Sequence, residues 1–245
     1  MKKRFILRIL PSIFTLGNLM CGFLAIINVI EGTSSSFITA AWWIIIAGIF
    51  DALDGKIARI AGSASEFGIE FDSIADVISF GIAPAILFYE YALIKAGTFG
   101  YILAFGFLAC GAIRLARFNI KATTGTKHFF QGLPIPASAG ILASFILFSE
   151  NVWGILANFD FSIGLIVVTS LAMVSSFKYS TFPKIGFNTK TDTIRSVWFL
   201  THVLIIIRFP DEAFFPTGIL YLLSGPVKFI SAPAVNLILH KVDSR

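Results

Sequence analysis

The chain has 245 residues, of which 56% are hydrophobic and 13% charged, and its net charge is +5. A soluble domain carries about twice this charged fraction, and the mean hydropathy of +0.85 is also too high for one. The apolar residues form long runs, and about 20 such residues cross a bilayer. The basic residues are scattered at the ends of these runs, which excludes a nucleic-acid-binding surface. We therefore expect a single integral membrane domain, all-α, over residues 1–245.

Eight apolar runs predict a polytopic bundle of about eight transmembrane helices, near residues 12–30, 39–59, 68–94, 99–118, 133–149, 161–177, 195–208 and 213–230. Because cytoplasmic loops are enriched in Lys and Arg, the charges orient the chain. With both termini in the cytoplasm, only Lys95 and Arg208 fall on the outer side. The seventh run is short, which leaves seven helices as the alternative. We expect the protein in the plasma membrane.

Four aspartates lie where a membrane helix should be apolar. Asp51 and Asp54 are in the second run, and Asp72 and Asp76 are in the third. Each costs about 2.5–3.5 kcal/mol at a helix centre. Spacings of three and four residues put each pair on one helix face. These side chains must therefore face one another, water or a cation.

A short turn joins the two aspartate-bearing helices, and Ser63 with Glu66 has the spacing of a capping box that starts the third helix. The turn brings the two pairs together, and four converging carboxylates repel one another. Mg²⁺ or Mn²⁺ prefers such oxygen ligands, and two divalent cations about 3.5–4 Å apart suit phosphoryl transfer. The alternative is the ion or proton pathway of a cation-coupled transporter.

The spacing around the aspartates is more specific than their charge. The stretch reads Asp51-x2-Asp54-Gly55-x2-Ala58-Arg59-x8-Gly68-x3-Asp72-x3-Asp76. It resembles, at all eight specified positions, the signature of the CDP-alcohol phosphotransferase family. The resemblance implies that Asp51, Asp54, Asp72 and Asp76 bind two metal ions and that Asp76 is also the general base. It further implies a CDP-diacylglycerol donor held in the membrane, release of CMP, an active site facing the cytoplasm, and a homodimer.

Several small or polar residues are candidates for contact with the CDP-lipid. Glycine and alanine let a nucleotide approach the helix backbone, although small residues also serve helix packing. An arginine at a helix end either binds phosphate through its planar fork or anchors the helix at the interface. Polar residues on the first helix either face the nucleotide or form hydrogen bonds between helices. The candidates are Thr15, Asn18, Gly55, Ala58, Arg59 and Gly68.

The acceptor alcohol is predicted from a second resemblance. The segments 11–22, 114–119 and 131–137 are similar to the phosphatidylserine synthase branch of the family, which implies L-serine as acceptor. A cationic side chain would suit the serine carboxylate, and the candidate serine-binding residues are Arg114, Arg117, Asn119 and Gln131. The alternatives are that both arginines are membrane-interface anchors, or that the acceptor is glycerol 3-phosphate or inositol phosphate.

Overall fold

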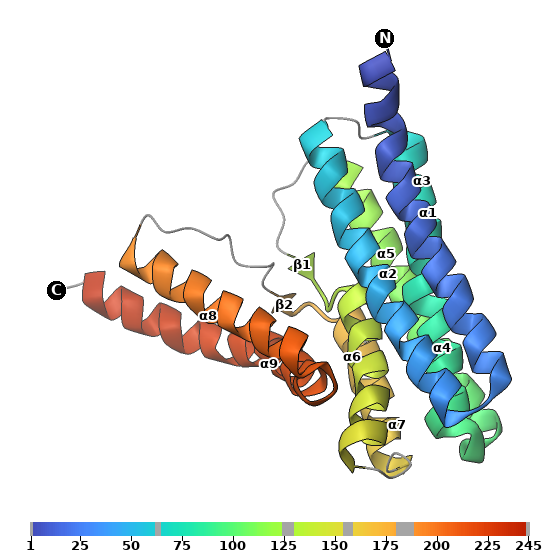
Figure 1. Cartoon of the computed structure of the whole chain (residues 1–245). Helices are drawn as coiled ribbons and strands as arrows, with labels where there is room; N and C mark the ends of the chain where they lie inside the picture. Colours follow the sequence, from blue (N-terminus) through green and yellow to red (C-terminus); the bar gives the residue numbers. More distant parts are fainter. Residues whose placement is uncertain (1, 62–64, 124–129, 154–158, 180–188, 244–245) are drawn as a thin grey trace.

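The structure is a computed structural model that describes residues 2–61, 65–123, 130–153, 159–179 and 189–243 (Figure 1). Almost all of these residues are helical, as predicted, and two short strands pair with each other. The elements are α1 Lys2–Glu31, α2 Ser34–Ala61, α3 Glu66–Asp76, η1 Val77–Ile82, α4 Ala83–Phe88, η2 Tyr89–Leu93, η3 Ile94–Ala96, α5 Thr98–Thr123, β1 Phe130–Gln131, α6 Ile135–Phe148, η4 Ser149–Trp153, α7 Phe159–Val174, β2 Lys178–Tyr179, α8 Lys190–Arg208 and α9 Pro210–Asp243.

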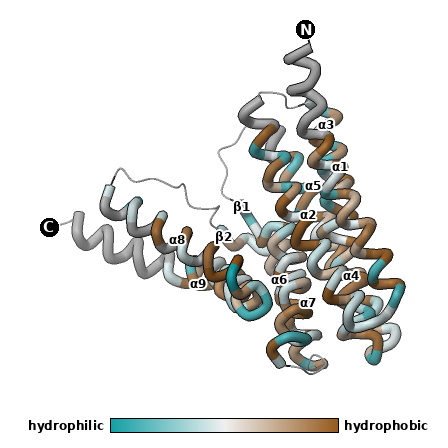
Figure 2. Tube along the Cα trace, in the orientation of Figure 1, coloured by the Kyte–Doolittle hydropathy of each residue, from teal (hydrophilic) through white to brown (hydrophobic). Residues whose placement is uncertain are grey.

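Within the described residues, six helical segments are long and apolar enough to cross a membrane: Ile13–Glu31, Ser34–Ile57, Glu66–Ala96, Thr98–Ile120, Ile135–Trp153 and Pro210–Ser231. α7 is apolar but shorter, at 16 residues. Large hydrophobic side chains face outward, among them Ile102, Phe105 and Leu171, each at least 60% exposed. Figure 2 shows hydrophobic stretches along the helices of the bundle. An integral membrane bundle is therefore confirmed, and the spans predicted near residues 161–177 and 195–208 stay a prediction.

The third span changes its helical form along its length. α3 ends at Asp76, and the chain continues as a π-helix in η1, as α4, and as a second π-helix in η2. A π-helix widens the turn and rotates the residues after it. The side chains after Asp76 therefore do not follow the helical wheel that the sequence alone suggests.

The start of α3 differs from the sequence prediction. Its N-cap is Ser65, whose Oγ accepts a hydrogen bond from the backbone N–H of Gly68 at 3.0 Å. The predicted capping box placed this cap at Ser63, two residues too early. Ser63 lies outside the described residues. Ser65 satisfies one of the free N–H groups that every helix N-terminus leaves.

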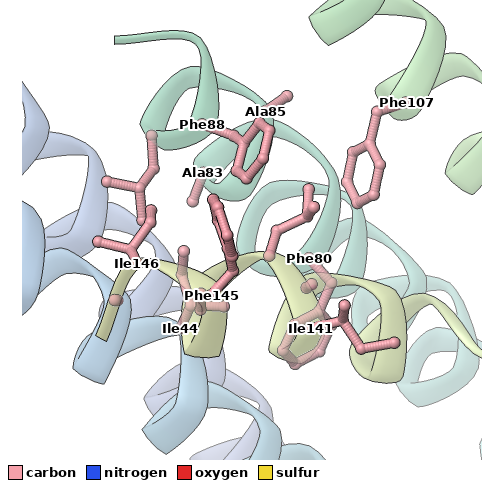
Figure 3. Packing of buried hydrophobic residues seen from close by; sticks show 14 of the residues in the cluster. Ile44, Phe80, Ala83, Ala85, Phe88, Phe107, Ile141, Phe145 and Ile146 are labelled. Atoms are coloured by element: carbon pink, nitrogen blue, oxygen red, sulfur yellow. The ribbon is translucent and has the colours of Figure 1, made fainter. Parts of the chain in front are cut away.

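The hydrophobic core lies where α6 crosses the third span (Figure 3). Phe145 of α6 is fully buried, and its ring lies 5.9 Å from that of Phe88, 5.4 Å from Phe161 and 5.2 Å from Phe215. These partners come from α4, α7 and α9. One side chain of α6 thus joins this helix to three others through tilted ring contacts, and aromatic pairs of this kind stabilise beyond their buried area.

The C-terminal helices α8 and α9 form a hairpin that extends away from the bundle (Figure 1). The first part of α9 packs against α6, and Gly218 allows this because a Cβ there would lie 2.9 Å from Ile141. β1 and β2 pair antiparallel, with Gln131 opposite Lys178. Gly132 follows with φ +83°, and a side chain there would collide with the carbonyl oxygen of Met173. The paired strands therefore close tightly over the end of α7.

Candidate active site

Three of the four predicted aspartates converge between α2 and α3. Carboxylate oxygens of Asp51, Asp72 and Asp76 all lie within 4.8 Å of one another. Asp76 is only 7% exposed, and Asp51 and Asp72 are partly buried. Like charges this close repel strongly in a medium of low dielectric constant. The arrangement is therefore stable as three anions only with a cation among them.

The fourth aspartate, Asp54, is 6% exposed and accepts a hydrogen bond from the hydroxyl of Thr15 on α1. It lies outside the group of three, although it is near enough to Asp51 and Asp72 to repel both. One turn further along α1, the amide Nδ2 of Asn18 donates to Oδ1 of Asp76 at 3.1 Å. Both α1 residues that the sequence assigned to the CDP-lipid therefore contact aspartates.

The position of α1 relative to η1 is set by a close contact between the two helices. The Oγ of Ser79 in η1 donates to the backbone oxygen of Asn18 at 2.9 Å. One turn after Asn18, a Cβ on Gly22 would lie 2.8 Å from the Cα of Ser79, so only glycine permits the approach. Sequence reasoning missed Ser79, because its orientation depends on the π-helix. The one available signal was the glycine four residues after Asn18.

Arg114 of α5 supplies a positive charge beside the carboxylates. It is 7% exposed, interacts electrostatically with Asp76, and has its guanidinium carbon 6.0 Å from the centre of the Phe118 ring. Its Nε is buried and has no hydrogen-bond partner among the described residues. A buried guanidinium with an unused donor is suited to an anionic ligand that enters the site.

The other predicted serine-binding residues have different surroundings. Arg117 is exposed and donates to the backbone oxygen of Val174 at 3.3 Å, where α7 ends. Asn119 donates through Nδ2 to Oγ of Ser73 at 2.8 Å. Gln131 is exposed on β1. Of the four, the structure thus brings Arg114 to the aspartates, whereas Arg117 forms its hydrogen bond with the end of α7.

The small residues of the signature differ in how much room surrounds each of them. A Cβ built on Gly55 meets no heavy atom within 4 Å, so packing within the described part of the chain does not require a glycine there. At Gly68 a Cβ would lie 3.1 Å from Oγ of the capping residue Ser65. Ala58 and Arg59 belong to α2, and their side chains lie outside the description.

Three buried polar atoms around this cluster lack hydrogen-bond partners in the described structure: Oδ1 of Asn18, Oδ1 of Asp72 and Nε of Arg114. A buried polar atom without a partner costs about 1–3 kcal/mol. Such atoms concentrated in one place indicate a site whose partners arrive with a ligand. Two are acceptors and one is a donor, which suits a cation together with an anionic substrate.

Comparison with known proteins agrees with this geometry. A model of the CDP-alcohol phosphatidyltransferase family matches residues 8–177. A CDP-diacylglycerol–serine O-phosphatidyltransferase of Helicobacter pylori (strain J99) is 36% identical over 97% of this chain and 98% of its own length. One of Methanocaldococcus jannaschii is 39% identical over 66% of this chain and 73% of its own length. The archaetidylserine synthase of Methanothermobacter thermautotrophicus is 37% identical over 74% of this chain and 73% of its own length. The chain belongs to the CDP-alcohol phosphatidyltransferase family.

Proposed function

We propose that the protein transfers the phosphatidyl group of CDP-diacylglycerol to the hydroxyl of L-serine and releases CMP. The observation that carries this proposal is the convergence of Asp51, Asp72 and Asp76 beside the buried cation Arg114. Relatives that match this chain over nearly its whole length bear the name of this activity. The reaction belongs to phospholipid biosynthesis in the membrane.

The donor set fits divalent cations. Carboxylate oxygens are the ligands that Mg²⁺ and Mn²⁺ prefer, and the unpartnered Oδ1 of Asp72 is an available lone-pair donor. Asp51, Asp54, Asp72 and Asp76 would hold two such ions, with Asp54 held ready by Thr15. The bound ions would neutralise the charge of the donor diphosphate and of the departing CMP.

The chain's own groups carry the proton and orient the reactants. In the proposed step Asp76 accepts the proton of the serine hydroxyl. The serine oxygen forms a bond to the lipid-side phosphorus, the bond from that phosphorus to the CMP oxygen breaks, and CMP leaves with its electron pair. Asn18 holds one Asp76 oxygen through its Nδ2, which leaves the other oxygen for the proton. Positioning of this kind is the main protein contribution to phosphoryl transfer.

We assign the CDP-lipid to the space beside α2 and the start of α3. The open surroundings of Gly55 permit close approach of a nucleotide, and Ala58 and Gly68 would extend this small-residue surface. Arg59 would bind the donor phosphate. Thr15 and Asn18 would act on the donor mainly through the aspartates that they contact.

For serine, the proposed ligand of the carboxylate is Arg114, because it combines burial, an unused donor and a position beside Asp76. Direct contacts of serine with Arg117, Asn119 and Gln131 stay predictions from the sequence. Asn119 is joined to α3 through Ser73, and so would order the helix that carries Asp72 and Asp76.

The proposal includes a topology of eight spans with both termini in the cytoplasm. α7 and α8 would then cross the membrane besides the six long segments. The site would face the cytoplasm from the plasma membrane, since Lys56 and most other cations follow the cytoplasmic ends. A homodimer is part of the same proposal.

The test is an assay of the purified protein with CDP-diacylglycerol, Mg²⁺ or Mn²⁺, and labelled serine. We expect labelled lipid and an equal amount of CMP, both lost on addition of EDTA and restored by excess Mg²⁺ or Mn²⁺. Transfer to glycerol 3-phosphate or inositol phosphate in place of serine would overturn the assignment of serine as the acceptor. No CMP release with any of the three acceptors would overturn the enzymatic reaction itself.

A further inference from the structure

The first half of α9 is fastened to the segment that follows α7. The hydroxyl of Tyr179 on β2 donates to the backbone oxygen of Leu222 at 3.1 Å. The ring of Phe177 packs against that of Phe229 with centroids 5.4 Å apart. These contacts lie on either side of Gly225, and they fix how far α9 is rotated and how far it is shifted along its axis.

Gly225 makes this fastening close. A Cβ there would lie 2.5 Å from the Cζ atom of Tyr179, so a side chain would push α9 off the strand. Tyr179 is 3% exposed, and burial, with Tyr221 adding to it, raises its pKa to about 12. Its hydroxyl therefore keeps its proton and remains a hydrogen-bond donor across the physiological pH range.

The consequence is the position of Tyr221, the residue before Leu222. Its ring lies 5.5 Å from that of Tyr179, and it interacts electrostatically with the guanidinium of Arg114. Arg114 in turn interacts with Asp76. Arg114 therefore lies within electrostatic range of both Tyr221 on α9 and Asp76, the proposed general base.

The contribution of α9 is not visible in the family pattern. The family match ends at residue 177, before α8 and α9 begin. The Helicobacter pylori relative, in contrast, aligns over 97% of this chain. The C-terminal hairpin is thus shared with a full-length relative although it lies outside the region common to the family.

We propose that Tyr221 is a substrate-binding residue of the acceptor site, whose hydroxyl donates a hydrogen bond to the serine carboxylate held by Arg114. This inference rests on the proposed function and deepens it. A phenol beside a guanidinium offers a second donor in a different direction, and two donors fix the orientation of a carboxylate better than one. The C-terminal hairpin would then be part of the active site, with Tyr179 and Gly225 holding Tyr221 in place.

The test is Tyr221→Phe, which removes the hydroxyl and keeps the ring that packs on Tyr179. Loss of one hydrogen bond to a charged group predicts a KM for serine raised about tenfold or more, with kcat and the KM for CDP-diacylglycerol unchanged. The matched control is Tyr101→Phe, because Tyr101 also stacks on another tyrosine, Tyr89. Tyr101 is 61% exposed and lies in the first turn of α5, more than three turns before Arg114. We expect this control to leave all three constants unchanged.

A double-mutant cycle with Arg114→Lys separates direct binding from packing. If both residues bind the same carboxylate, the rise in the serine KM of the double variant is smaller than the product of the two single effects. An unchanged serine KM in Tyr221→Phe, or effects that multiply fully, would overturn the inference while the wild-type assay still supports serine transfer. A wild type without serine transfer would overturn the proposed function instead.

Discussion

Two buried regions of this molecule show opposite relations between packing and charge. Around Phe145, rings from α4, α6, α7 and α9 fill the interior with contacts between apolar groups. Around Asp76, the interior holds several carboxylates, a guanidinium, and buried polar atoms without partners. The first arrangement is complete within the chain, whereas the second becomes complete only with ligands. The first region stabilises the fold, and the second gives up part of that stability for reactivity.

The largest effect that separates the two regions is expected from Asp76→Asn. Loss of a general base lowers turnover by about 10²–10⁴-fold. Because the change also removes one of three carboxylates that repel one another, the unfolding temperature in EDTA should stay equal or rise. CMP release and thermal unfolding in detergent measure the two quantities.

The matched control for Asp76→Asn is Glu70→Gln, which removes an exposed carboxylate from the same helix, α3. We expect it to retain wild-type turnover. Wild-type turnover in Asp76→Asn would contradict the assignment of the base. A lower unfolding temperature in EDTA would contradict the view that the carboxylates repel one another in the ligand-free fold.

Phe145→Ala should have the opposite signature. Truncation of a buried phenylalanine costs about 3–5 kcal/mol of unfolding free energy, while the folded fraction should keep its kcat because the ring is not part of the aspartate cluster. Ile102→Ala, at a position 60% exposed on the outer surface, is the control and should change little. An equal loss of stability in both variants would show that the ring contacts of Phe145 have no special weight.

The sequence predicted the helical membrane fold and the aspartate pairs well, because both follow from local spacing. Apolar runs define spans, and separations of three and four residues define helix faces. The position of Ser79 and the cap at Ser65 were not predictable in this way. The first depends on a π-helix that begins after Asp76, and the second on a choice between two nearby serines in one turn.

Which side chains the polar α1 residues contact could also not be predicted from the sequence. Asn18 was predicted to face the nucleotide or a neighbouring helix, and the structure places its Nδ2 on Asp76. Side chains on separate helices meet according to the axial shift between the helices, which no local pattern encodes. The same holds for Tyr221, whose approach to Arg114 depends on the fastening of α9 to β2.

Asn18→Leu should produce an intermediate effect. The substitution keeps the size of the side chain and removes the donor to Asp76, and a hydrogen bond to a charged group contributes about 1.5–3 kcal/mol, or about 10- to 150-fold in turnover. Asn28→Leu is the control on the same helix, since Asn28 donates to the backbone oxygen of Leu24 far from the site. A loss of affinity for CDP-diacylglycerol with normal kcat would contradict the positioning role.

The smallest effect is expected from Arg117→Gln. The exposed guanidinium of Arg117 bonds a carbonyl at the end of α7, and a cation at a helix C-terminus contributes about 0.3–1 kcal/mol. We therefore expect a slightly lower unfolding temperature and an unchanged KM for serine, whereas Arg114→Gln should raise that KM strongly. If Arg117→Gln raises the serine KM as much as Arg114→Gln does, both arginines bind the acceptor. The division between a buried ligand-binding arginine and an exposed structural one would then be wrong.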